Sequence, residues 1–353
     1  MMMHAIAAAT FFAGAVAVPQ SAAAKVQVYI MMGQSNMLGE GKIGLPGDKS
    51  AGKNTTLFSA VHAGKYPYLW DKSTSNWTTS KTMRNVFVMG SGGPTSKVTL
   101  QTNNFMNGGE GHRGSIGPEL GIGGMLEQGV AVPTMMLKSC IGNRGLGWDL
   151  LPPTQKSFDW PDPKNASEVW TYAGYGQSPS RWLKGTTPKP IGWKAGIQYD
   201  GDLKRADDVL ADLKTYYPDA TGYEVAGFFW WQGDRDSRDL AYTEHYEANL
   251  VALIKALRLH YKVPKAPFVT ASLGQSTLPV SACLGNCGGG ILQAMMNVAD
   301  ATKYPDFKGN VGFVNSHPLE NTPGSSGGHY GGDALTYMNI GEAMGMAMTK
   351  LLK

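Results

Sequence analysis

Residues 26–37 read Val-Gln-Val-Tyr-Ile-Met-Met-Gly-Gln-Ser-Asn-Met, an apolar run that passes directly into a polar turn. Branched and aromatic residues dominate 26–32, which is typical of a short buried strand. Gly33 permits a tight turn at the end of that strand, and such a turn exposes the side chain of Ser35. The stretch therefore predicts a strand with a polar site at its carboxyl end.

Similar apolar runs alternate with helix-like segments along the chain. Further strands are expected at 130–138, 225–231, 267–271 and 311–314. Apolar residues at helical spacing predict helices at 117–127, 203–216, 241–260, 291–301 and 337–352. This alternation predicts one α/β domain, 25–353, with a central, mainly parallel sheet between two layers of helices. Two segments rich in Gly and other loop formers, 40–112 and 141–195, are expected to be long decorating loops with a few short strands.

The first 24 residues contain no Lys, Arg, Asp or Glu. Their apolar stretch, 5–18, is shorter than the roughly 20 residues that a membrane-spanning helix needs. Small residues at 21–24 follow it, as a signal peptidase requires. We therefore expect residues 1–24 to be a cleaved signal peptide and the mature protein to be secreted, extracellular or periplasmic, and free of the membrane. An anchor or an unstructured tail is the alternative.

Charge and cysteine content exclude several classes of protein. The net charge is only +4 and no Lys/Arg-rich run occurs, so we expect no nucleic-acid partner. Three cysteines do not suffice for a zinc site. Cys283 and Cys287 are spaced to close a disulfide in an oxidising compartment, and Cys140 is expected to be buried. The sequence does not reveal the oligomeric state.

Polar residues that follow strands are the candidates for chemistry, because ligands bind beyond the carboxyl ends of parallel strands. Ser35, the segment 232–236 and His329 all fall at that edge by the predicted order of elements. A nucleophilic serine needs an exposed hydroxyl, a base and backbone N–H donors for the developing oxyanion. Spacing alone leaves a second interpretation open, in which Ser35 only caps the short helix that follows it.

The segment 33–39, Gly-Gln-Ser-Asn-Met-Leu-Gly, resembles the nucleophile block of the SGNH-related carbohydrate acetylesterases. That group includes the sialate O-acetylesterase-like proteins and the acetylxylan esterases of carbohydrate esterase family six. The resemblance continues, in the family's order, at 117–120, at 230–234, at His329-Tyr330, and at Tyr337, Gly341 and Gly345. It implies the SGNH-hydrolase fold, a flavodoxin-like three-layer sandwich, and carbohydrate O-acetylesterase activity by serine catalysis without metal or organic cofactor.

The resemblance also implies roles for individual residues. Ser35 matches the nucleophile and His329 the general base, with His112 and His317 as rivals for the latter. Many SGNH enzymes carry an Asp three residues before the histidine, and here that position is Ser326. Asp234 is therefore the expected third member of the triad. Asp236, Asp333 and a Ser–His dyad remain the alternatives.

Donors for the oxyanion and contacts for the sugar are also implied. The Ser35 N–H is the expected first donor, with the side chain of Asn143 or Gln232 as its companion. Gln34, Trp231 and Arg235 are the candidate substrate-binding residues, and Trp148 and Trp230 are further indoles on which a sugar ring stacks. Two other functions stay open: a non-catalytic carbohydrate-binding protein on the same fold, and a short-chain esterase or lipase of the same superfamily.

Overall fold

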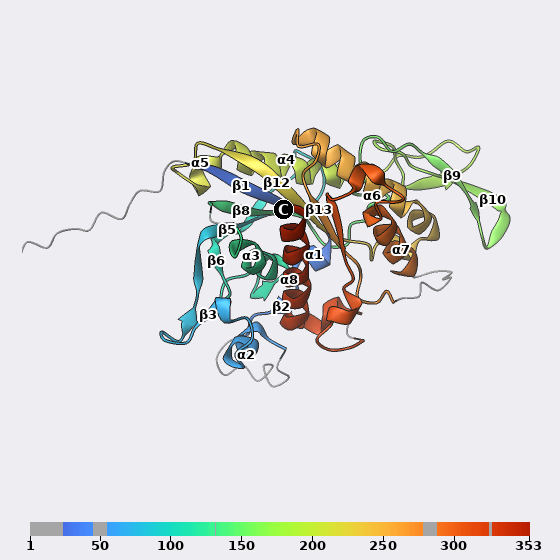
Figure 1. Ribbon diagram of the computed structural model, residues 1–353. Coiled ribbons are helices and arrows are strands. Elements are labelled where there is room, and N and C mark those ends of the chain that lie inside the picture. The colour runs from blue at the N-terminus through green and yellow to red at the C-terminus, as the bar shows by residue number, and fades with distance from the viewer. Residues whose placement is uncertain (1–23, 45–54, 131, 278–287, 325–326) are drawn as a thin grey trace, which may run out of the picture.

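The computed structural model describes residues 24–44, 55–130, 132–277, 288–324 and 327–353 (Figure 1). Nearly all of the predicted signal peptide, the Cys283–Cys287 pair and Ser326 lie outside these residues. Within the described part of the chain, no helix combines the length and the apolar character needed to cross a membrane.

A seven-stranded sheet forms the centre of the fold, in the order β14-β13-β12-β1-β8-β5-β6. The strands are β1 Lys25–Gly33, β5 Thr79–Met89, β6 Thr99–Asn107, β8 Thr134–Ser139, β12 Gly222–Trp231, β13 Phe268–Ala271 and β14 Val311–Val314. All neighbours are parallel except β5 and β6, so only the edge strand β6 runs against the rest. The predicted mainly parallel sheet is confirmed.

Helices cover both faces of this sheet. They are α1 Ser35–Leu38, α2 Leu57–His62, α3 Glu119–Glu127, α4 Ile197–Ala211, α5 Leu213–Tyr216, α6 Leu240–His260, α7 Gly288–Ala299 and α8 Ala334–Leu351. One hydrophobic cluster joins the sheet to α4, α6 and α7, and a second joins the other face to α1, α2, α3 and α8. Figure 1 shows α3 and α8 side by side across the second face. The three-layer α/β sandwich is therefore confirmed.

The first strand shows why this sheet has a core on each side. Successive side chains of a strand point to opposite faces. Val28 and Ile30 accordingly enter the cluster below α4 and α6, whereas Tyr29 and Met31 enter the cluster below α3 and α8. Because β1 lies between β12 and β8, it is apolar on both faces, as expected of a central parallel strand.

The expected loops contain more regular structure than the sequence indicated. The segment 40–112 holds β5 and β6, two long strands of the main sheet, so its assignment as loops with short strands is wrong. The segment 141–195 holds a separate antiparallel sheet of β9 Phe158–Asp162, β10 Asn165–Tyr172 and β11 Arg181–Leu183, which projects to one side in Figure 1. Short strand pairs β2–β7 (Gly41–Lys42, Ser115–Ile116) and β3–β4 (Trp70–Asp71, Asn76–Trp77) complete the described strands.

Candidate active site

Ser35 lies at the start of α1, directly beyond the carboxyl end of β1. The turn before it depends on Gly33, whose φ is 150° and whose added Cβ would lie 2.3 Å from the Trp231 carbonyl oxygen. The Gln34 N–H donates to that same carbonyl, 3.2 Å away. The side chain of Ser35 is half-buried. Close packing of the turn on β12 thus fixes where the hydroxyl of Ser35 points.

His329 is the side chain that meets this serine. Its Nε2 lies 2.8 Å from Ser35 Oγ, although the two residues are 294 positions apart. The rival histidines have other partners: His317 Nδ1 donates to the Gly274 carbonyl at 2.6 Å, and the His112 ring packs on Phe87. The structure therefore places a base within hydrogen-bond reach of the candidate nucleophile.

A left-handed turn carries His329. All five residues from Gly328 to Gly332 have positive φ, including His329 at 60° and Tyr330 at 57°. Such a conformation costs an ordinary residue on the order of 1 kcal/mol, so other contacts must hold it. Tyr330 supplies them: its ring is buried against Trp231, and its hydroxyl accepts from the Gly274 N–H at 3.2 Å. Sequence reasoning identified the His-Tyr pair but not this anchoring role.

The three candidate carboxylates all have other partners. Asp234 pairs with Arg238 at 2.5 Å. Asp333 caps α8 by accepting from Leu335 N, and it also accepts from the side chains of Asn321 and Thr322. Asp236 accepts from the backbone of residues 146–147. In the part of the chain that the structure describes, no hydrogen bond joins a carboxylate to His329, so Asp234 as the third member of the triad stays a prediction.

The loop after β8 brings backbone groups to Ser35. A Cβ added to Gly142 would lie in van der Waals contact with Ser35 Cβ, at 3.6 Å, so this loop passes next to the serine. Asn143, the next residue, is exposed and has a φ of 56°. Gln232 is fully buried, and its amide donors already face Gln34 Oε1, Asp236 Oδ2 and the Arg144 carbonyl. Of the two predicted companions for Ser35 N–H, Gln232 already has its amide donors engaged inside the protein, and Asn143 stays a prediction.

Two of the three predicted substrate contacts lie inside the protein. Gln34 is 1% exposed, and its Oε1 accepts from Gln232 Nε2 and the Arg235 N–H. Trp231 is 0% exposed and donates to the Ser272 carbonyl, and Trp230 is equally buried on the other face of the sheet. Neither indole offers a surface to a sugar, because consecutive strand residues enter the two cores.

Arg235 remains exposed and borders a polar cavity of about 340 Å³. The cavity adjoins the loops after β8 and β12. Aromatic and charged side chains line it: Trp148, Asp149, Arg181, Arg235, Asp236, Arg238, Asp239 and Tyr242. Planar guanidinium groups and carboxylates of this kind bind sugar hydroxyls, so the cavity is a candidate sugar site at the carboxyl edge of the sheet.

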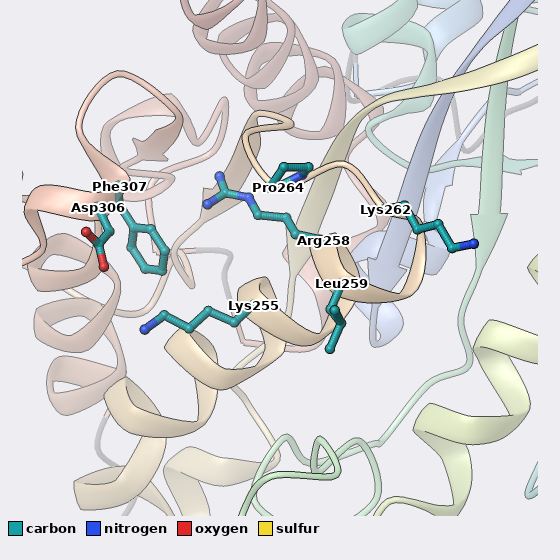
Figure 2. Close-up of a pocket in the computed structure, with 7 residues that line it drawn as sticks. All are labelled: Lys255, Arg258, Leu259, Lys262, Pro264, Asp306 and Phe307. Carbon is teal, nitrogen blue, oxygen red and sulfur yellow. The ribbon is translucent and has the colours of Figure 1, made fainter.

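A second cavity, of about 560 Å³, lies at the C-terminal end of α6 (Figure 2). Arg258 at its floor donates to the Ala266 and Asn310 carbonyls, the residues that lead into β13 and β14. This is the amino-terminal edge of the sheet, away from Ser35. Figure 2 shows that Lys255 and Lys262 point in different directions, so the cations do not converge on one ligand.

Ligands for a metal are not gathered in the described ranges. No group of three His, Cys, Asp or Glu side chains there has the arrangement that would hold an ion. Cys140 is buried, as expected, and burial raises the pKa of its thiol well above the usual range. The candidate site is thus built from hydroxyl, imidazole, amide and backbone groups.

Comparisons with solved structures show the fold. A carbohydrate acetylesterase from Xanthomonas citri is 11% identical, with a TM-score of 0.50, and the match covers 91% of this chain and 55% of that one. A protein from Arabidopsis thaliana is 13% identical, with a TM-score of 0.48 and coverage of 92% and 98%. NanS is 14% identical, with a TM-score of 0.38 and coverage of 83% and 78%. The comparison with curated proteins found no match.

A family model gives the more specific result. The model described as "carbohydrate esterase, sialic acid-specific acetylesterase" matches residues 171–350, half of the chain. The matched part contains Asp236 and His329, and Ser35 precedes it. The chain belongs to this family of carbohydrate esterases.

Proposed function

We propose that the protein is a serine O-acetylesterase that removes acetyl groups from a poly- or oligosaccharide. The observation that carries the proposal is the 2.8 Å approach of His329 Nε2 to Ser35 Oγ at the carboxyl edge of the sheet. Membership of the carbohydrate esterase family supports the substrate class. The polar cavity that Arg235 borders, lined in part by the loops after β8 and β12, is the proposed room for the sugar.

The proposed reaction is acyl transfer in two steps. Ser35 Oγ forms a bond to the acetyl carbonyl carbon while His329 Nε2 takes the hydroxyl proton of Ser35. The carbonyl oxygen becomes an oxyanion, which Ser35 N–H and donors of the loop after β8 stabilise. The imidazolium then gives its proton to the departing sugar oxygen, and the acetyl group stays on Ser35. Water, deprotonated by the same imidazole, releases acetate and restores the serine.

Acetate release from purified protein tests the proposal. Wild type, Ser35→Ala and His329→Ala are assayed on acetylated xylan and on 4-nitrophenyl acetate, with the exposed Ser73→Ala as the matched control. Both site variants are expected to lose at least about 1,000-fold in kcat, because nucleophile and base act as a unit. Ser73→Ala is expected to keep the wild-type rate. Undiminished turnover by Ser35→Ala would rule the mechanism out.

Two further measurements separate the alternatives. A fluorophosphonate labels an activated serine, so labelling of wild type but not of Ser35→Ala is expected. A wild type that is neither labelled nor active on any acetyl ester would indicate a non-catalytic carbohydrate-binding protein. Activity that rises from acetate to octanoate esters would instead indicate a lipase-like specificity.

A further inference from the structure

We infer that Asp236 is a positioning residue of this site: its buried carboxylate holds the segment 142–147 in place beside Ser35. This segment, called the 142–147 loop below, follows β8 and carries Gly142 and Asn143. The inference rests on the proposed function, because it assigns Asp236 to positioning the loop that is proposed to stabilise the oxyanion. It does not make Asp236 a partner of His329.

The carboxylate of Asp236 is saturated with donors from two segments. Oδ2 accepts from the Leu146 N–H at 2.8 Å and from Gln232 Nε2 at 2.6 Å. Oδ1 accepts from the Gly147 N–H at 2.7 Å. The side chain is 1% exposed, so water does not replace these bonds when one is lost.

Neighbouring side chains hold the rest of the loop in the same way. The Gly145 N–H donates to Asp149 Oδ2 at 2.9 Å, and the Arg144 carbonyl accepts from Gln232 Nε2 at 2.9 Å. Every residue from 144 to 147 therefore has a backbone group fixed by a buried side chain. The loop's path depends on these bonds, because it has no strand or helix partner of its own.

The 142–147 loop passes next to the nucleophile. Gly142 approaches Ser35, as its added Cβ would lie 3.6 Å from Ser35 Cβ. Gln232, which bonds to Asp236, also donates to Gln34 Oε1 at 3.1 Å, and Gln34 directly precedes the serine. Asp236 thus connects both sides of the proposed oxyanion site, the turn that carries Ser35 and the loop that carries Asn143. Donors for an oxyanion are effective only when their positions are fixed before the reaction.

The charge state of Asp236 decides whether its carboxylate accepts all three hydrogen bonds that hold the 142–147 loop and Gln232. Burial raises its pKa to about 6, and the nearby Asp149 carboxylate adds to the effect. The other titratable or charged groups around it are Arg235, Arg238, Asp239 and Tyr242 on the shared cavity and Tyr246 from α6. Above about pH 6 both oxygens of Asp236 accept. Below that pH one oxygen carries a proton, and an acceptor of the loop is lost.

Asp236→Asn tests the inference with almost no change of shape. Asn keeps one acceptor oxygen, but its NH₂ group faces N–H donors of the loop or of Gln232. We expect kcat on 4-nitrophenyl acetate to fall about 10- to 100-fold, less than the roughly 100- to 1,000-fold for complete removal of an oxyanion donor because the donor is only displaced, with KM changed less than about threefold. The exposed Asp208→Asn is the matched control and is expected to behave as wild type.

The pH profile of kcat supplies a readout that a purely structural role would not change. Protonated Asp236, like Asn, lacks one acceptor, so wild type is expected to lose a further factor of about 10 to 100 in kcat, relative to Asp236→Asn, as the pH falls through about 6. The ratio of wild-type to Asp236→Asn kcat is therefore expected to approach 1 at acidic pH. Asp149→Asn offers a second test if Asp236→Asn does not fold: loss of the Asp149 charge lowers the pKa of Asp236, so the acidic fall in kcat moves to lower pH.

The outcomes distinguish this inference from the proposed function. A wild-type kcat in Asp236→Asn, or a ratio of wild-type to variant kcat that does not change with pH, overturns the role of Asp236 while Ser35→Ala remains inactive. A drop in kcat matched by a lowered Tm, with that ratio constant, would show that Asp236 only stabilises the fold. Full activity of Ser35→Ala would instead contradict the proposed function itself.

Discussion

The ammonium group of Lys138 lies 2.6 Å from the Glu119 carboxylate, and both side chains are almost completely buried. Lys138 Nζ also donates to the Leu38 carbonyl at 3.0 Å, at the end of the short helix that begins with Ser35. The other oxygen of Glu119 accepts from the Gly117 N–H. Glu119, in the first turn of α3, therefore takes part in a buried ion pair beneath α1.

Lys138→Met is expected to destabilise the protein by about 3–5 kcal/mol, because it leaves the Glu119 carboxylate buried without a counter-charge. Urea unfolding measures the change. Lys204→Met, which breaks the exposed pair with Asp208, is the control and should cost less than about 1 kcal/mol. Equal effects of the two substitutions would contradict the importance of the buried pair.

Gly33→Ala is expected to prevent folding or to remove several kcal/mol of stability, since its Cβ would lie 2.3 Å from the Trp231 carbonyl oxygen. Gly64→Ala separates this clash from backbone strain. Gly64 also has a positive φ, of 84°, but no atom lies within 4 Å of its added Cβ, so a cost of only about 1 kcal/mol is expected. Soluble yield and thermal unfolding distinguish the two variants.

Tyr330→Phe removes the acceptor of the Gly274 N–H while keeping the buried ring. An unpaired buried N–H costs about 1–3 kcal/mol, and the left-handed turn that carries His329 should loosen. We expect kcat on 4-nitrophenyl acetate to fall roughly 3- to 10-fold with KM nearly constant. Tyr223→Phe, at an exposed position, should leave both constants unchanged. An unaltered kcat in Tyr330→Phe would mean that the ring alone holds the turn.

Arg235→Ala is expected to raise KM for acetylated oligosaccharides about 3- to 10-fold, because it removes an exposed guanidinium group from the wall of the polar cavity. The same variant should retain wild-type kinetics on 4-nitrophenyl acetate, which has no sugar to bind. Initial-rate measurements on both substrates check this. A parallel loss on the small ester would place Arg235 in the chemistry rather than in sugar binding.

The order of elements around Ser35 could be predicted because buried parallel strands leave a clear apolar signal. β1, β12 and β13 are such strands, and their ends agree with the predicted bounds to within a few residues. β6 could not be predicted from its sequence, Thr-Leu-Gln-Thr-Asn-Asn-Phe-Met-Asn. It is an edge strand with few buried side chains, so it has neither the apolar run nor the alternation that marks a strand.

The residues that support the site were less accessible to sequence reasoning than the pair that performs the proposed chemistry. Ser35 and His329 belong to recognisable blocks. The sequence offers Asp236 only as a partner for the histidine, because its bond to Leu146 spans 90 positions. No local pattern records a contact of that range. Burial of both Trp230 and Trp231 could not be predicted either. Adjacent strand residues face opposite ways, so the sequence places one of the two indoles in a core, but no signal shows that the other is also buried.

The central place of β1 in the sheet has a consequence for the maturation of the protein. The strand that leads to Ser35 is synthesised early, but it pairs with residues 134–138 and 222–231, and the base follows the last strand. A chain still emerging from the ribosome thus carries the serine hydroxyl without a proton acceptor. Long-range pairing of this kind forms slowly. On the proposed serine mechanism, hydrolytic competence therefore arises only when synthesis and folding are nearly complete, and partly made chains are expected to be inert towards esters in the cell that produces them.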